Sequence, residues 1–278
     1  MKIGFIDYYL DEWHANNYPE FFKTRSNGEF EVVCAYGKID NPHGGMTNLE
    51  WSKKYNVPLV DTIEEVIEKS DVLIVLSPDN PEMHEELVKL PLKSGKHTYI
   101  DKTFAPDRAT AERIFAYAKE NGTKCFSSSA LRFSKELDDI DTSEIHKLYS
   151  EGSGTYEIYS IHQIEPIIRL MNCRAKEVMF LGEEEHPAML IKFEDGRFAH
   201  MYHRRHEDYN FKMTIVKKDT NAIEVPIYSK YFDAFIDSVI EFFKTGVVPV
   251  ESEQTIDVIA VREAGLRAMK KPFEWVQV

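Results

Sequence analysis

The sequence predicts an α/β protein with two domains. A doubly wound parallel sheet of the Rossmann type is expected over residues 1–130, and an α+β domain built on a mostly antiparallel sheet over residues 131–278. In the first half, short apolar runs alternate with segments of helical periodicity, which is typical of parallel strands joined by helices. In the second half, apolar and polar residues alternate with a period of two, which is typical of strands with one covered face.

The first domain is expected to contain strands at its short apolar runs, residues 2–6, 30–36, 71–77, 97–101 and 124–129. Helices are expected between them, over residues 12–25, 49–55, 63–70, 81–90 and 108–122. Thr62 and Asp107 stand where N-caps are needed, because their side-chain oxygens can accept hydrogen bonds from the free amides of a helix start. The carboxyl ends of such parallel strands form the edge at which open α/β sheets bind ligands.

The second domain is expected to be mostly strands followed by two amphipathic helices. The alternating segments are residues 154–161, 188–205, 212–218 and 223–229, with a hairpin turn at Asp195-Gly196. The helices are expected over residues 231–244 and 254–269. The sequence leaves open whether these C-terminal helices pack back on the first domain.

Composition excludes several classes of protein. The net charge of −13 argues against a general nucleic-acid binder, which needs a concentrated basic face. Cys34, Cys125 and Cys173 are too far apart for a CxxC pair, which suits a reducing compartment. The first residues lack the long apolar core of a secretory signal, and no window approaches the roughly 18 apolar residues of a membrane span. We therefore expect a cytoplasmic protein with no membrane or nucleic-acid partner.

Four segments, in order along the chain, resemble the family of glucose-fructose oxidoreductase, inositol dehydrogenase and MocA-like proteins. SPDNPEMHEE is similar to the family's threonine-proline-asparagine loop, and GKHTYIDKTFA to the strand that ends in Glu-Lys-Pro. SSSALRFSKEL resembles the stretch that joins the two domains, and SIHQIEPIIRLM the helix that carries the substrate histidine. These segments are residues 77–86, 95–105, 127–137 and 160–171. One such motif would be weak evidence, but four in register are fairly specific.

The resemblance implies a set of catalytic residues. Lys102 matches the lysine of Glu-Lys-Pro and would stabilise an alkoxide on the substrate, while His162 matches the substrate histidine and would act as general base. Glu165 falls where the family often has an aspartate, and it could orient His162. Ile158 stands where the dehydrogenases usually have an acid, four residues before the histidine. The lysine and the histidine are therefore present, but the usual acid is not.

The resemblance also implies a dinucleotide cofactor, NAD or NADP. The residues it places at the cofactor follow the first, third and fourth strands of the expected sheet. They are Asp7, Tyr8, Tyr9, Ser77, Pro78, Asp79, Asn80, His84, Asp101 and Lys102. No metal site is implied.

The largest departure from the family is the segment after the first strand. The family has GxGxxG there, and its glycines let the pyrophosphate approach the start of a helix. This chain has no glycine between Gly4 and Gly28, and its acids Asp7, Asp11 and Glu12 would repel phosphates. The second strand ends in Tyr-Gly-Lys, without the acid that usually binds the adenine ribose. We expect weak dinucleotide affinity, with NAD or NADP bound in an unusual way or not at all.

The same residues have structural explanations, which the sequence leaves open. Lys102 could be a surface lysine after a strand, His162 a partly buried histidine at a helix start, and Glu165 a solvated acid. The cluster of Asp7, Asp11, Glu12 and His14 could bind a cation or a sugar, although helix-capping acids beside one packed histidine are the simpler interpretation.

A zinc site at His200, His203 and His206 is disfavoured by strand geometry. Residues 200 and 203 of one strand point to opposite faces, so they cannot readily share one metal ion.

We therefore expect an NAD(P)-dependent oxidoreductase that acts on a sugar, polyol or related hydroxy compound. The main alternative is a non-catalytic ligand-binding or regulatory protein that kept the fold but lost its dinucleotide affinity. A third possibility is a lyase or epimerase with a tightly held cofactor. The expected partners are a small-molecule substrate and further copies of the chain, joined through the C-terminal sheet as in relatives.

Overall fold

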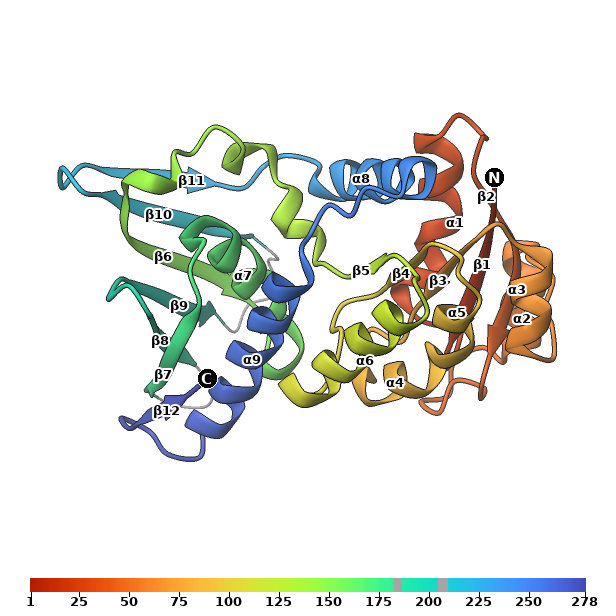
Figure 1. Ribbon diagram of the computed structural model, residues 1–278, viewed down its shortest axis with the longest axis horizontal. Helices are drawn as coiled ribbons and strands as arrows, with labels where there is room; N and C mark the ends of the chain where they lie inside the picture. Colours follow the sequence, from red (N-terminus) through yellow and green to blue (C-terminus); the bar gives the residue numbers. More distant parts are fainter. Residues whose placement is uncertain (183–186, 205–209) are drawn as a thin grey trace. The chain divides into compact units, whose positions relative to one another are not determined.

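The computed structural model describes residues 1–182, 187–204 and 210–278 (Figure 1). They form two compact units. The first unit contains residues 1–128 and 235–252, and the second contains residues 129–234 and 253–278. The first unit therefore includes most of a helix from near the C-terminus.

The first unit is made of alternating strands and helices. In chain order they are β1 (Lys2–Asp7), α1 (Trp13–Arg25), β2 (Glu31–Gly37), α2 (Asn48–Tyr55), α3 (Ile63–Lys69), β3 (Val72–Val75), η1 (Pro81–Met83), α4 (His84–Leu87), α5 (Lys89–Lys93), β4 (Thr98–Ile100), α6 (Arg108–Glu120), β5 (Cys125–Phe126) and α8 (Tyr231–Thr245). Thr62 caps α3 and Asp107 caps α6, as expected from the sequence.

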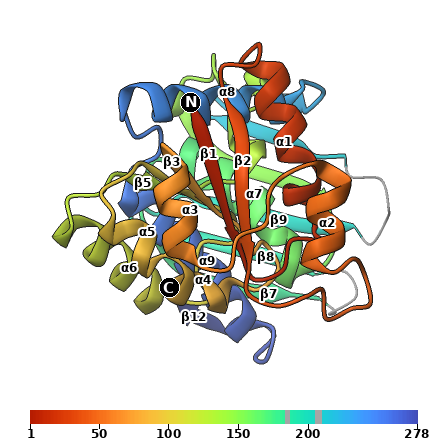
Figure 2. The ribbon, with the colours of Figure 1, turned by 90° about the vertical axis from the view of Figure 1, so that its right-hand side faces the viewer.

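The five strands pair in parallel in the order β2-β1-β3-β4-β5, which confirms the doubly wound sheet. Figure 2 shows α1 and α3 on opposite sides of β1 and β2. On the α1 side, aromatic rings join the helices to the sheet: Phe22 packs against Phe243 of α8, and Tyr99 of β4 against Phe235. This packing brings α8 into the core of the first unit.

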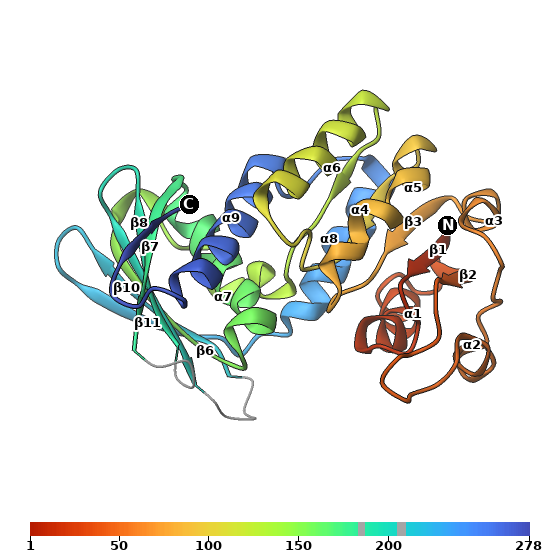
Figure 3. The same ribbon diagram turned by 90° about the horizontal axis from the view of Figure 1, so that it is seen from below.

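The second unit is built on a seven-stranded sheet. Its elements are η2 (Ala130–Phe133), η3 (Lys135–Leu137), η4 (Thr142–Glu144), β6 (Ile145–Ser153), α7 (Tyr156–Met171), β7 (Ala175–Leu181), β8 (Ala188–Phe193), β9 (Phe198–Arg204), β10 (Lys212–Lys217), β11 (Ala222–Pro226), α9 (Ser252–Ala268) and β12 (Trp275–Gln277). The strand order is β11-β10-β6-β9-β8-β7-β12, and every pair is antiparallel except β6 with β9. Figure 3 shows α7 and α9 on the same side of this sheet. The mostly antiparallel second sheet is thus confirmed.

One expectation for the second half is wrong. Residues 154–161 do not form a strand but begin α7, which Thr155 precedes as its N-cap. Tyr156 and Ser160 are buried whereas Ile158 is 43% exposed, so the buried positions follow helical spacing rather than a period of two. The strand comes earlier, as β6, where a mixture of charged residues and a glycine conceals the alternation.

Among the residues that the structure describes, no helix is both long enough and apolar enough to cross a membrane.

Candidate functional site

The segment after β1 supplies the cap of α1. The carboxylate of Glu12 accepts hydrogen bonds from the backbone amides of His14, at 2.6 Å, and of Ala15. Glu12 is 7% exposed. Free amides at a helix start are the groups that bind phosphate in nucleotide-binding folds, because they point outward and carry partial positive charge. In this protein a side chain of the chain itself binds them, so the capping interpretation of Glu12 is confirmed.

Residues 38–47 close over this segment. Two backbone hydrogen bonds tie the start of residues 38–47 to the end of β1 and the residue that follows it. The amide of Met46 donates to the Asp11 carboxylate at 2.7 Å, and the side-chain oxygen of Asn48 accepts from the amide of Leu10 at 3.0 Å. A methyl group on Gly45 would collide with the side-chain ends of Asp11 and Asn41, so any other residue there would displace them. Most polar groups of the β1–α1 segment thus form hydrogen bonds with other residues of the protein.

Tyr8 and Tyr9 are part of the same packed segment. Their rings lie 5.9 Å apart, and the Tyr9 ring meets His43 edge-on at 6.1 Å. Tyr9 is buried, and burial raises the pKa of its hydroxyl to about 12. The rings of Tyr8 and Tyr9 therefore fill the space beside the β1–α1 segment.

Acidic side chains gather at the carboxyl end of β1. Burial raises the pKa of Glu12 to about 7, although the neighbouring imidazole of His14 favours the charged form. Burial, and next the charge of Glu12, raise the pKa of Asp7 well above its usual value. The Oδ2 atom of Asp7 is buried without a hydrogen-bond partner among the described residues. The surroundings of these two carboxyl groups therefore disfavour their charged forms.

Asp101 follows β4 and binds the packed histidine. Nδ1 of His14 contacts its carboxylate, and the hydroxyl of Tyr99 donates to it at 3.1 Å. Burial opposes the charge of Asp101, but His14 holds its pKa below the usual value. The His14 ring also stacks on Tyr18 at 5.0 Å. This residue, which stands in place of the family's glutamate, thus anchors the start of α1 to the end of β4.

Lys102 lies beside the segment that follows β3. Its ammonium group is 3.5 Å from the Pro78 carbonyl oxygen and 3.6 Å from the Asp79 carboxylate, and the residue is 8% exposed. The surface-lysine alternative is therefore wrong. The Ser77 hydroxyl donates to the Asn80 carbonyl at 3.0 Å, which shapes this turn from within. The two segments singled out by resemblance, residues 77–80 and 101–102, thus meet at the carboxyl edge of the sheet.

His84 is buried beneath these segments rather than exposed to a ligand. One ring nitrogen lies 2.6 Å from the Leu76 carbonyl and the other 3.0 Å from the Phe104 carbonyl. The side chain is completely buried, and burial lowers its pKa. We interpret His84 as a link between the residues after β3 and those after β4.

In the second unit, His162 of α7 contacts Ser129. Its Nδ1 is 2.7 Å from the Ser129 hydroxyl. The Ser129 amide donates to Glu165 at 3.3 Å, and Arg132 forms an ion pair with the same carboxylate at 3.1 Å. Glu165 is 2% exposed, so the interpretation of this residue as a solvated acid is wrong. Its carboxylate holds the segment that carries Ser129.

Ser129 contacts the candidate residue His162, although nothing in the sequence singles it out. It lies in the SSSALRF stretch, whose resemblance to the family gave it no role. A serine is common in turns and caps, and Ser129 does cap η2, so its type alone gives no signal. Only the packing of α7 against η2 places its hydroxyl at His162.

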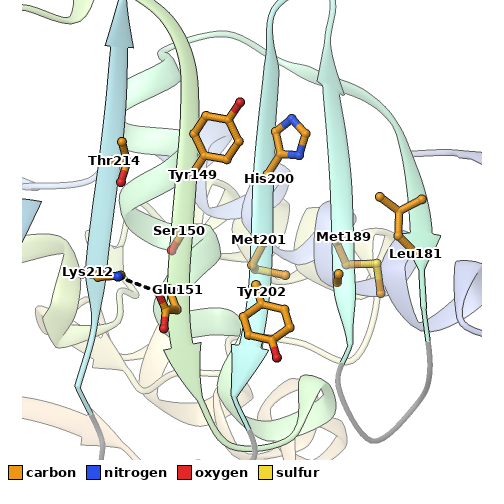
Figure 4. A pocket seen from close by; sticks show the side chains of 11 residues that line it. Tyr149, Ser150, Glu151, Leu181, Met189, His200, Met201, Tyr202, Lys212 and Thr214 are labelled. Atoms are coloured by element: carbon orange, nitrogen blue, oxygen red, sulfur yellow. Dashed lines mark ion pairs between the residues drawn. The ribbon is translucent and has the colours of Figure 1, made fainter. Parts of the chain in front are cut away.

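The sheet of the second unit has a hollow on its other face. Figure 4 shows side chains of β6 to β10 around it, a space of about 240 Å³. The rings of Tyr149 and His200 stack at 4.6 Å, and Lys212 forms an ion pair with Glu151 at 3.0 Å. Tyr202, also in the lining, is 42% exposed. This face combines aromatic surface with charges at its margin.

The histidines of β9 point to opposite faces of this sheet. His200 is half-buried at the hollow, whereas His203 is completely buried on the helix side. The opposite orientation expected for these two residues is confirmed. His206 lies outside the described residues.

A dinucleotide does not fit at the start of α1. In Rossmann domains its pyrophosphate lies on the amides of a helix start, and an acid at the end of the second strand binds the ribose. Here Glu12 holds those amides, and Lys38 at the end of β2 forms an ion pair with Glu86 at 2.6 Å. The segments after β3 and β4, with Lys102, retain groups that can bind a polar ligand.

Residues 14–129 match the model of an oxidoreductase family with an NAD-binding Rossmann fold. A dTDP-3,4-didehydro-2,6-dideoxy-α-D-glucose 3-reductase of Actinomadura kijaniata is 32% identical over 72 residues, and the uncharacterized oxidoreductase YhhX of Escherichia coli (strain K12) is 31% identical over 67 residues. These matches cover 26% and 24% of this chain, and 22% and 19% of those proteins.

Solved structures share the fold over the whole chain. The myo-inositol dehydrogenase of Lactobacillus casei, in complex with NAD(H) and myo-inositol, is 14% identical, with a TM-score of 0.82 over 100% of this chain and 96% of that one. The scyllo-inositol dehydrogenase of Lactobacillus casei is 16% identical, with a TM-score of 0.78 over 99% and 98% of the two chains. Residues 14–129 are thus similar to the oxidoreductase family with an NAD-binding Rossmann fold, and the whole chain shares the fold of the two inositol dehydrogenases.

Proposed function

We propose that this protein is an oxidoreductase that interconverts a hydroxyl and a carbonyl group on a sugar, polyol or related hydroxy compound. The observation that carries the proposal is the position of Lys102, a buried ammonium group at the carboxyl edge of the sheet beside the segment after β3. The family's dinucleotide, NAD or NADP, takes up hydride when it is bound. The comparisons do not favour the non-catalytic alternative.

Lys102 is suited to stabilise negative charge on a substrate oxygen. An ammonium group has three N–H donors, and its contacts with Pro78 and Asp79, at 3.5 and 3.6 Å, are long for hydrogen bonds. A donor is therefore available for the oxygen that becomes an alkoxide during oxidation. In a buried site this stabilisation is stronger than it would be in water.

His162 is suited to move the proton of the substrate hydroxyl. Its Nδ1 lies 2.7 Å from the Ser129 hydroxyl, which fixes the orientation of the ring. An imidazole titrates near neutral pH, which suits both acceptance and return of a proton. We assign Ser129 as a positioning residue. Its hydroxyl contacts the His162 ring, and its backbone amide donates to Glu165, which forms an ion pair with Arg132.

The experiment is a turnover assay of the purified protein with a panel of sugars and polyols and with NAD or NADP. Lys102→Ala and His162→Ala should each lower turnover about a hundredfold or more, the usual scale for electrostatic and acid–base roles. Lys93→Ala and His146→Ala, at exposed positions, are the matched controls. Turnover of no compound in the panel, or full turnover in Lys102→Ala, would overturn the proposal.

The proposal includes a homo-oligomer formed through the sheet of the second unit. The hollow of Figure 4 and the exposed rings of Tyr149 and Tyr202 support it, because aromatic surface is enriched where proteins associate. Tyr202→Asp should shift the mass measured by light scattering towards the monomer. Tyr228→Asp, at a ring 85% exposed in the segment after β11, is the control. A monomeric wild-type protein would refute this part.

A further inference from the structure

The start of α1 is closed to an outside anion by a side chain of the protein. Glu12 has the extended conformation of an N-cap, and its two carboxylate oxygens accept from the amides of His14 and Ala15. These amides are the donors that a bound phosphate would use. Since Glu12 is 7% exposed, its carboxylate lies within the packed structure rather than at its surface.

The side chain of Asn48 links the β1–α1 segment to the residues that follow β2. Its side-chain nitrogen donates to the carbonyls of Gly37 and Ile39 at 3.0 and 2.7 Å, and its oxygen accepts from the amide of Leu10. Leu10 is completely buried. A ligand that reached the amides of α1 would have to move the β1–α1 segment, which these bonds fix to residues 37–48.

The acidic residues around the start of α1 also oppose the binding of a phosphate. Asp7, Glu12 and Asp101 interact electrostatically, and His14 is the imidazole beside them. A pyrophosphate would bring further negative charge into this buried group of acids. Like charges repel most strongly where water is excluded. Both the occupied amides and the acidic surroundings therefore oppose a phosphate.

We infer that the Glu12 carboxylate takes the place of the dinucleotide's pyrophosphate, so that NAD or NADP binds at the start of α1 only after displacing it. The inference rests on the proposed function in one respect, namely that a dinucleotide is the cofactor. Glu12 thereby sets the dinucleotide affinity of this protein, in addition to capping the helix.

The test is calorimetric titration of the whole protein with NAD, NADH, NADP and NADPH. Wild-type protein should bind weakly, with a Kd above about 100 μM, or about −5 kcal/mol. Glu12→Gln should bind at least one dinucleotide about tenfold more tightly, because it removes the resident charge, an effect of the size expected at a helix start. Glu20→Gln, an exposed change in the same helix, should leave the affinity unchanged.

A second variant protects the test against misfolding. Glu12→Gly leaves a residue that caps helices almost as well and frees both amides, so it should also bind more tightly than the wild type. Circular dichroism and the thermal midpoint show whether each variant is folded. Equal affinity in the wild type and both folded variants would overturn the inference, as would micromolar binding by the wild type.

The outcomes separate this inference from the proposed function. Micromolar binding by the wild type, with turnover of a polyol, would refute the role of Glu12 and leave the oxidoreductase intact. Tighter binding by Glu12→Gln, without turnover of any compound by either protein, would support the role of Glu12 and refute the proposed reaction.

Discussion

Two buried glutamates, one in each unit, differ in how well their charge is compensated. Glu165 in α7 forms an ion pair with Arg132, which neutralises its charge within the second unit. Glu12 at the start of α1 is compensated by backbone amides and by the imidazole of His14, and burial still raises its pKa to about 7. The first carboxylate therefore stabilises its surroundings, whereas the second is a charge that its surroundings barely accommodate.

We therefore expect Glu165 to matter for stability and the charge of Glu12 to matter for ligand binding. Breaking the pair of Glu165 should cost stability, because it leaves the opposite charge buried and unpaired. Replacing Glu12 by glutamine should remove the cost of burying a charge, but it keeps only one of the two oxygens that accept from the amides of His14 and Ala15.

Arg132→Met should lower the free energy of unfolding by about 3–5 kcal/mol, the usual cost of removing one partner of a buried ion pair. Arg132 and Glu165 are 6% and 2% exposed, so water cannot replace the lost partner. Chemical denaturation followed by circular dichroism measures the change. A loss below about 1 kcal/mol would mean that Glu165 is no better compensated than an exposed acid.

The stability of Glu12→Gln relative to the wild type should be greater at pH 8 than at pH 5. The folded pKa of Glu12 is about 7 and its reference value is 4.5, so the folded state binds the proton more tightly. Its ionisation therefore lowers the free energy of unfolding as pH rises from about 4.5 to about 7. Asp7, whose pKa is also raised, adds to the same trend.

Thermal unfolding of both proteins at the two pH values measures the effect, which we expect to be on the order of 1–3 kcal/mol. The difference between the two proteins cancels the titrating groups far from residue 12 and retains Glu12 together with Asp7, whose pKa depends on the charge of Glu12. A difference that does not change with pH would show that Glu12 ionises as an ordinary surface acid does.

His203→Leu should show the opposite pH dependence. Burial lowers the pKa of His203 to about 4 from 6.5, despite the nearby backbone of Ser153 and Gly154. The unfolded chain therefore takes up a proton first, and wild-type stability falls as pH drops from about 6.5 to about 4. Relative to the wild type, the variant should gain about 2 kcal/mol at pH 5 compared with pH 8. Thermal unfolding tests this, and an equal effect at both pH values would refute it.

Ser129→Ala should lower turnover about tenfold, the loss expected when a positioning hydrogen bond of about 1.4 kcal/mol is removed. The pKa of His162, followed by NMR titration of its ring protons, should also change, which a merely structural serine would not cause. Ser143→Ala, at an exposed serine of η4, is the control. An unchanged His162 titration would remove Ser129 from the site.

Arg25→Ala should have the smallest effect, below about 1 kcal/mol. Arg25 and Asp237 form an ion pair at 2.5 Å within the first unit, but their side chains are 37% and 47% exposed. Water and salt therefore screen the pair. Chemical denaturation gives the value, and a loss as large as that of Arg132→Met would contradict the view that burial decides the strength of these pairs.

The order of strands and helices in the first unit could be predicted from the sequence alone. Its buried strands are apolar runs, and its helix starts carry the residues that cap them, such as Thr62 and Asp107. These signals are local, since each is read within one turn or one strand. The sequence also showed that the glycine loop is missing and that an acid near residue 12 caps the following helix, which the structure confirms.

Local periodicity failed where two patterns overlap. Residues 154–161 alternate in polarity over so few positions that a strand and the first turns of a helix look alike. The packing of α7 on the sheet decides between them, because it buries Tyr156 and Ser160 but leaves Ile158 exposed. A strand period of two can be told from helical spacing only over a longer segment than residues 154–161.

The contacts around the candidate site residues could not be predicted from the sequence, because they depend on tertiary packing. The bonds of Ser129 to His162 and of Arg132 to Glu165 join residues 33 apart in the chain, and Met46 reaches Asp11 across 35 residues. No motif or spacing encodes such pairs, because they depend on how helices pack on a sheet and on how a loop closes over its edge. The sequence named Lys102, His162 and Glu12, but packing determined which groups hold them.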